Sequence, residues 1–95
     1  MSDETKLPDF ITEDDGFMTI TLRSKATING EKVETLRMRE PTVDDINVMQ
    51  KMKGDDAGKE VKIISNLCEI TPSEVSALTL RNFGRVQEAF KLFTA

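Results

Sequence analysis

The chain has 95 residues and a formal net charge of −4. A chain of this length forms one compact domain and buries only roughly 60 to 65 % of its unfolded surface, which argues against a large sealed active-site cavity. No stretch approaches the roughly 18 consecutive apolar residues of a membrane-spanning helix, and the acidic N-terminus is unlike a signal peptide. We therefore expect a cytoplasmic protein with no membrane partner.

Negative charge is concentrated at the N-terminus. Self-repelling carboxylates, Pro8 and few apolar residues predict a disordered acidic arm over residues 1–16. The body, residues 17–95, is nearly neutral and has no basic stripe and no Trp or Tyr for base stacking, so we predict no nucleic-acid partner. The acidic residues of the arm, opposed only by Lys6, are Asp3, Glu4, Asp9, Glu13, Asp14 and Asp15.

Alternation of apolar and polar residues begins at Phe17 and continues to Ile28, which is typical of a half-buried strand. The dipeptide Asn29-Gly30 then predicts a type I′ turn, because both central positions of that turn need positive φ. Residues 31–39 return as the second strand of a β-hairpin.

The apolar residues of these two strands do not align in a regular ladder. The turn pairs Ala26 with Val33, whereas matching the outer residues pairs Leu22 with Leu36, and the first strand then holds one extra residue. We predict a β-bulge within residues 23–25. A longer, non-standard turn is the alternative.

Helical signals follow the hairpin. Pro41 ends the sheet and Thr42 is an N-cap for a helix that ends near Lys53. The Gly- and Asp-rich residues 54–58 predict a flexible loop, and apolar spacing predicts a second helix over residues 59–69.

Two further helices complete the chain. Thr71-Pro72-Ser73-Glu74 fits a capping box with proline at the first helical position, and Thr79 begins the last helix. The predicted fold is α+β: a hairpin (17–40) packed with three or four short helices (42–95). Either those helices or another subunit must cover the hairpin, because an isolated hairpin has little stability. The predicted structural residues are Asn29, Gly30, Pro41, Thr42, Thr71, Pro72 and Glu74.

Residues that could carry chemistry are scarce. The chain has no His, which removes the commonest general base and metal ligand. Cys68 lies among apolar residues and is predicted to pack as a small buried hydrophobe. The five glycines have no phosphate-loop spacing. We therefore predict no catalytic, cofactor or metal site, and an interaction module in place of an enzyme.

Apolar side chains are the remaining candidates for a functional surface. Met49 and Met52 share a helical face, and flexible thioethers suit varied apolar partners, although such stripes usually form core. The last helix carries an apolar stripe, in which Phe83 and Val86 are predicted as core. The stripe consists of Leu80, Phe83, Val86, Phe90 and Phe93. Its final turns are apolar on more than one side and fit either core or partner surface. The candidate partner-binding residues are Met49, Met52, Phe90, Leu92 and Phe93.

The order of these motifs resembles that of a known family. The motifs are Thr27-Ile28-Asn29-Gly30-Glu31, then Leu36-x-x-Arg39-Glu40-Pro41-Thr42-x-x-Asp45, then Leu67-x-x-Ile70-Thr71-Pro72-Ser73, and Asn82-Phe83. Over roughly residues 18–93 the chain is similar to the tail assembly chaperones of Mu-like and related contractile-tailed phages and prophages. It departs from them at Asn82, where an aspartate is expected, and we expect this to bear on capping of the last helix.

The resemblance implies a chaperone that keeps the long, helical tape measure protein soluble while the tail tube polymerises, and that is absent from the finished virion. It also implies a longer form of the chain made by ribosomal frameshifting as a partner, and the tail tube protein is a further candidate. Self-association into a homo-oligomer is expected. The alternative is a small structural or regulatory protein, such as a tail completion component or an antitoxin-like binder, that stays in its complex.

Overall fold

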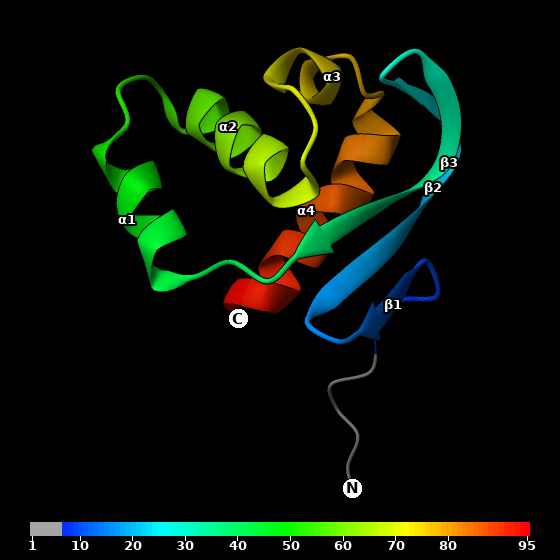
Figure 1. Cartoon of the computed structure of the whole chain (residues 1–95), viewed down its shortest axis with the longest axis horizontal. Coiled ribbons are helices and arrows are strands. Elements are labelled where there is room, and N and C mark those ends of the chain that lie inside the picture. Colours follow the sequence, from blue (N-terminus) through cyan, green and yellow to red (C-terminus); the bar gives the residue numbers. More distant parts are fainter. Residues whose placement is uncertain (1–6) are drawn as a thin grey trace, which may run out of the picture.

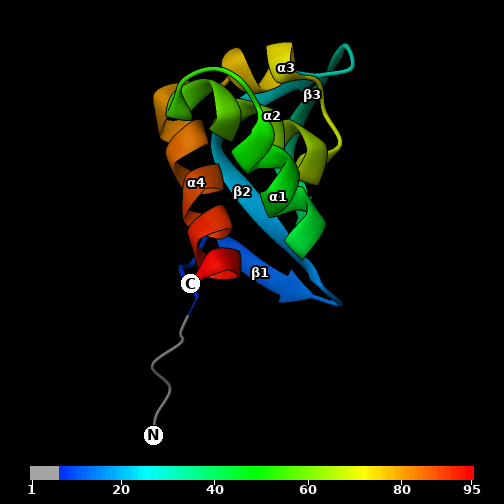
Figure 2. The same cartoon turned by 90° about the vertical axis from the view of Figure 1, so that its left-hand side faces the viewer.

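The structure, a computed structural model, describes residues 7–95. It combines one antiparallel sheet of order β1-β2-β3 with helices that cover one face of that sheet (Figures 1 and 2). This arrangement confirms the predicted α+β class. The elements are β1 (Ile11–Asp14), β2 (Phe17–Ile28), β3 (Glu31–Arg39), α1 (Val43–Lys51), α2 (Asp56–Cys68), α3 (Pro72–Ser76) and α4 (Leu80–Thr94).

The sheet has one more strand than the predicted hairpin. Ile11–Asp14 pairs antiparallel with β2, although acidic composition predicts disorder over residues 1–16. The reason is local: Asp15 and Gly16 have φ of 58° and 83°, the same left-handed pair found at Asn29-Gly30. Asp-Gly is a hairpin signal as Asn-Gly is, so the prediction was wrong for β1. Residues 1–6 of the predicted arm lie outside the described residues.

The pairing of β2 with β3 is interrupted where the bulge is predicted. Thr21 pairs with Thr35 and Ala26 with Val33, so β2 has five residue steps where β3 has two. The location of the irregularity is confirmed and the Asn29-Gly30 turn keeps its two-residue form. The predicted size was wrong, because β2 holds three extra residues, and Leu36 pairs with Ile20 instead of Leu22.

A buried side chain of α4 satisfies the backbone of this bulge. Asn82 is 1 % exposed, and its Oδ1 accepts the N–H groups of Arg23 (2.8 Å) and Ser24 (3.2 Å) while its Nδ2 donates to the Ser24 carbonyl (2.9 Å). These bonds replace the ladder bonds that the extra residues cannot make. Asn82 therefore anchors the sheet to α4, a role larger than the predicted effect on helix capping.

The helix caps follow their sequence signals closely. Thr42 and Thr71 each form a complete capping box, and Glu74 also accepts the N–H of Asn29 through its second oxygen at 2.6 Å, which ties α3 to the hairpin turn. The loop predicted over residues 54–58 is shorter than expected. Asp55 accepts the N–H of Gly58 at 2.8 Å and caps α2, which begins at Asp56.

The core lies between the sheet and the helices. Ile20 and Met38 from the sheet, Ile64 from α2 and Val86 from α4 are fully buried there. The helices of the same chain thus cover the apolar face of the hairpin, which decides between the two covers left open by the sequence.

Candidate functional site

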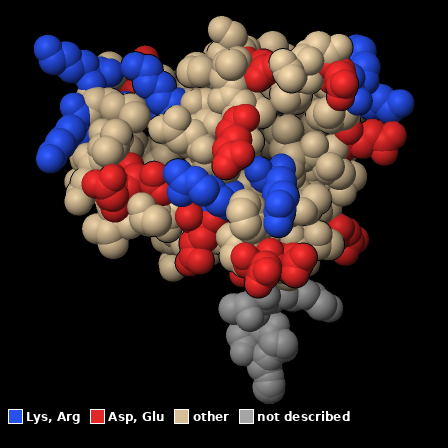
Figure 3. Space-filling model, viewed as in Figure 1, with Lys and Arg blue, Asp and Glu red and all other residues tan. Residues whose placement is uncertain are grey.

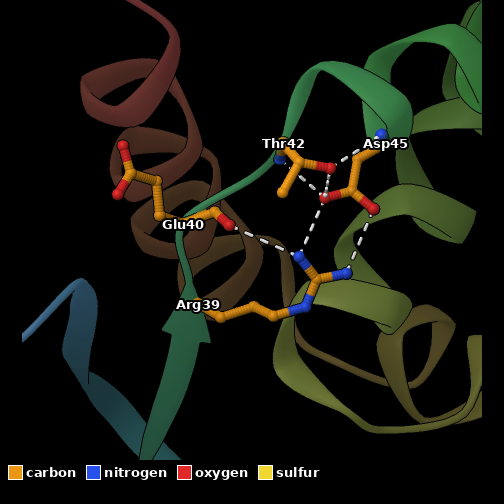
Figure 4. Close-up of polar contacts among 4 residues, drawn as sticks. All are labelled: Arg39, Glu40, Thr42 and Asp45. Atoms are coloured by element: carbon orange, nitrogen blue, oxygen red, sulfur yellow. Dashed lines mark hydrogen bonds and ion pairs between the residues drawn. The ribbon is translucent and has the colours of Figure 1, made fainter.

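The motif Arg39-Glu40-Pro41-Thr42-x-x-Asp45 joins the sheet to α1 (Figure 4). The guanidinium of Arg39 donates to both carboxylate oxygens of Asp45, at 2.8 and 3.1 Å. The same carboxylate accepts the N–H of Thr42 at 2.7 Å, and Thr42 Oγ1 accepts the N–H of Asp45 at 3.2 Å. Asp45 therefore closes the capping box of α1 and pairs with the last residue of β3.

These contacts shift the pKa of both ionic groups. The hydrogen bond from Arg39, followed by that from the Thr42 N–H, holds the pKa of Asp45 well below its usual range. The hydrogen bond to Asp45 raises the pKa of Arg39. Both groups are charged at neutral pH, and a bidentate pair of this kind fixes orientation as well as distance. The pair sets the direction in which α1 leaves the sheet.

Helix α1 packs on the molecule through half-buried side chains, Ile46 and Met49. It contains no fully buried residue and packs on α2 at the edge of the molecule (Figure 1). Its half-buried Met49 forms one wall of a depression of roughly 470 Å³, which we call the first hollow. The first hollow is lined by Met49 of α1, by Asp56, Ala57, Lys59 and Glu60 of α2, and by Phe90 of α4.

The five predicted partner-binding residues divide into three groups. Met49 and Phe90, from helices far apart in sequence, meet in the first hollow. Leu92 and Phe93 line no part of that hollow, although all four of these side chains are half-buried and pack against the core. Met52 is half-buried and follows the last turn of α1 as its C-cap.

A second hollow, of roughly 200 Å³, lies at the start of α4. Leu80, the first residue of the apolar stripe of α4, lies on its rim and is 87 % exposed. Phe83, in the same stripe, is half-buried and Val86 is fully buried. Burial therefore increases from the first residue of α4 inward along the stripe, and spacing alone does not show where burial begins. The second hollow is lined by Val61, Val75, Ser76, Leu78, Leu80 and Phe83.

A polar contact stands between the two hollows. Gln87 Nε2 of α4 donates to Glu60 Oε1 of α2 at 3.0 Å. On α4, Gln87 follows Phe83 of the second hollow and precedes Phe90 of the first. On α4 this polar contact lies between Phe83 and Phe90, and on α2 its Glu60 also lines the first hollow.

Acidic side chains occupy a different part of the surface. Glu13, Asp14 and Asp15 are exposed, and acidic groups gather over the β1–β2 turn at the lower edge of the face in Figure 3. The hollows and this acidic turn are built by different elements. The acidic turn is therefore distinct from the hollows, although the first hollow has charged residues of its own.

The side chains that could support chemistry are few. Burial raises the pKa of the Cys68 thiol to about 12, so this thiol is protonated at neutral pH and packs as predicted. Within residues 7–95, no group of three or more His, Cys, Asp or Glu is placed to hold a metal ion. The chemistry offered by the described surface is that of apolar and polar contact.

A family model described as phage tail assembly chaperone proteins, E, or 41 or 14, matches residues 19–95. The chain belongs to the phage tail assembly chaperone family. No curated protein and no solved structure matches it. The match includes the two hollows, the Arg39–Asp45 pair and the bulge with its Asn82 anchor, whereas β1 precedes it. In the part of the chaperone that the structure describes, no helix has the length and apolar character to cross a membrane.

Proposed function

We propose that this chaperone binds and solubilises the tape measure protein during tail tube assembly. The observation that carries the proposal is the pair of apolar hollows beside α4, with Leu80, Phe90 and Met49 left partly or largely exposed by a complete fold. Exposed apolar groups gathered in depressions are typical of surfaces that bind other proteins. The chaperone acts by contact and not by catalysis.

The shape of the surface fits a helical client. An amphipathic helix binds by placing its apolar face in a groove between other helices. The hollows are shallow and open, and Met49 is a flexible side chain that adapts to different apolar partners. Weak contacts of this kind allow release when the tube closes around the tape measure protein.

Co-expression tests the proposal. The tape measure protein is produced in bacteria alone, with the chaperone, and with a Leu80→Ala, Phe90→Ala chaperone, and its soluble fraction is measured. We expect the native chaperone to raise that fraction and the double variant to lose most of the effect, because each substitution removes an apolar contact from one hollow. An unchanged soluble fraction with the native chaperone would contradict the proposed function.

Location gives a second test. The chaperone is proposed to act in the cytoplasm of the host bacterium and to be absent from the finished virion. Mass spectrometry of purified particles and of infected-cell lysate should detect it in the lysate only. A fixed number of copies per particle would favour the alternative, a tail component that remains in its complex.

A further inference from the structure

The two hollows lie along one seam, which we define as the surface where α2 and α4 face each other. Helix α4 contributes Phe83 to the second hollow and Phe90 to the first, and α2 contributes Val61 and Ala57 in the same way. Phe83 and Phe90 are one heptad apart, which corresponds to two helical turns and about 10.5 Å. A helix lying along α4 repeats its own apolar face at that interval. The spacing of the hollows therefore matches one face of a second helix.

The seam carries a carboxylate that forms an ion pair with no Lys or Arg of residues 7–95. Glu60 is half-buried and accepts a hydrogen bond from the neutral amide of Gln87. The ion pairs among the described residues are Lys25–Glu34 and Arg39–Asp45, so Glu60 takes part in neither. The first hollow adds Asp56 against Lys59, which leaves an excess of negative charge. A Lys or Arg entering between the hollows would complement Glu60.

The exposed side of α4 leaves room for a helix to approach closely. Gly84 lies one turn after Leu80, and a Cβ atom built on it would meet nothing within 4 Å. Glycine is unfavourable inside a helix, and no neighbour in the described chain requires it at this position. Bare backbone beside the exposed Leu80 permits close contact between helices.

We infer that the α2–α4 seam binds an amphipathic helix of another protein through two large apolar side chains one heptad apart, with a Lys or Arg between them facing Glu60. The inference rests on the proposed function and specifies which feature of the client is recognised. The seam recognises the spacing of two apolar side chains and one positive charge on the client helix, so it can bind many helical segments that share this pattern.

Synthetic helical peptides test the pattern with the purified full chain. The first peptide carries two Leu one heptad apart with a Lys between them. The second has the same composition with one Leu moved to the opposite face, and the third has Glu in place of Lys. We expect dissociation constants about tenfold higher for the second and third peptides. Equal affinity for all three peptides would overturn the inference.

Variants of the chain locate the site. Leu80→Ala should raise the dissociation constant of the first peptide about fivefold or more. Val43→Ala is the matched control, because Val43 is 78 % exposed on α1 and lines neither hollow. Melting curves should be unchanged for both, since both side chains are exposed. Glu60→Gln should remove the preference for the Lys peptide over the Glu peptide. Equal effects of Leu80→Ala and Val43→Ala would place binding elsewhere and overturn the inference.

Two outcomes separate this inference from neighbouring ones. If Leu80→Ala abolishes self-association of the chain but leaves peptide binding intact, a second copy occupies the seam and the inference fails. If the Leu80→Ala variant solubilises the tape measure protein as well as the native chain does, the inference about the seam fails while the proposed function stands. If the native chain does not solubilise that protein, the proposed function itself fails, whatever the peptides show.

Discussion

At the scale of single residues, the side chain of Asn82 makes contacts that amino-acid composition does not reveal. Asn82 both accepts from and donates to the backbone of the β2 bulge, and an amide can do both at once through two separate atoms without carrying a charge. The aspartate expected at this position from the family pattern could accept the two N–H groups but could not donate to the Ser24 carbonyl. The bulge of this chain is therefore matched to asparagine.

The substitution Asn82→Asp tests that match. It buries a carboxylate against the Ser24 carbonyl and removes one hydrogen bond, so we expect a loss of about 2–3 kcal/mol in the free energy of unfolding. Urea denaturation at neutral pH measures the loss. Asn47→Asp, on the exposed side of α1, is the matched control and should change stability little. Equal losses of stability for the two substitutions would show that the amide of Asn82 does not stabilise the fold.

Two glycines should respond to alanine in opposite directions. Gly84 lies inside α4 with open space around it, so Gly84→Ala should stabilise the chain by about 0.5–1 kcal/mol. Gly30 has a φ of 81° in the hairpin turn, so Gly30→Ala should cost about 1–2 kcal/mol. Thermal unfolding of the two variants checks the signs. Destabilisation by Gly84→Ala would mean that α4 is irregular at that residue.

At the scale of elements, the Arg39–Asp45 ion pair joins the end of β3 to the first turn of α1. The pKa of Asp45 is lowered in the fold, so its ionised form stabilises the native state at a pH above its ordinary value of 3.8. This stability is lost as the pH falls through and below that value, because the unfolded chain binds the proton first.

Asp45→Asn should therefore flatten the acid side of the stability curve. We expect the variant to be less stable than the native chain at pH 7 by about 1–3 kcal/mol, and the difference to shrink as the pH drops below about 4. Chemical denaturation at a series of pH values measures this. Some acid sensitivity should remain, since the Thr71 and Asn29 N–H groups also lower the pKa of Glu74. A difference that is constant with pH would contradict the assignment.

Local signals predicted most elements, and long-range contacts explain the exceptions. Asn29-Gly30 and the capping boxes of Thr42 and Thr71 act within a few residues, so their structures could be predicted from sequence. The size of the bulge depends on Asn82, 58 residues from Ser24, and no local pattern encodes it. Strand β1 had a usable signal in Asp15-Gly16, but the surrounding acidic residues masked it.

The candidate surface was predictable only in part for the same reason. Met49 and Phe90 could be selected as apolar candidates, yet their meeting in one hollow depends on how α1 and α4 approach α2. Leu80 shows the converse, because it shares an apolar stripe with the buried Val86 and yet is 87 % exposed at the first residue of α4. The spacing of apolar residues identifies one face of a helix, and tertiary packing determines which residues that face contacts.

On the scale of the whole molecule, β1 belongs to the folded body and not to a separate arm. Ile11 is buried in the same core as Ile20 and Val86, so Ile11→Ala should cost about 2–3 kcal/mol. Thr12→Ala, on the exposed side of β1, is the control and should change the melting temperature little. If Ile11→Ala had no effect on thermal unfolding, β1 would contribute nothing to the fold.

The anchoring of the β2 bulge by Asn82 has a consequence for synthesis of the chain. The bulge is translated early, but the amide that satisfies its backbone lies in the last helix and leaves the ribosome late. The sheet therefore cannot reach its final form during translation of the first three helices. Folding is completed only after α4 has emerged, which is the slow order expected when contacts join distant parts of a chain. Until then the nascent chain presents an incomplete sheet, and a partner that binds between α2 and α4 meets the complete surface only once α4 has left the ribosome.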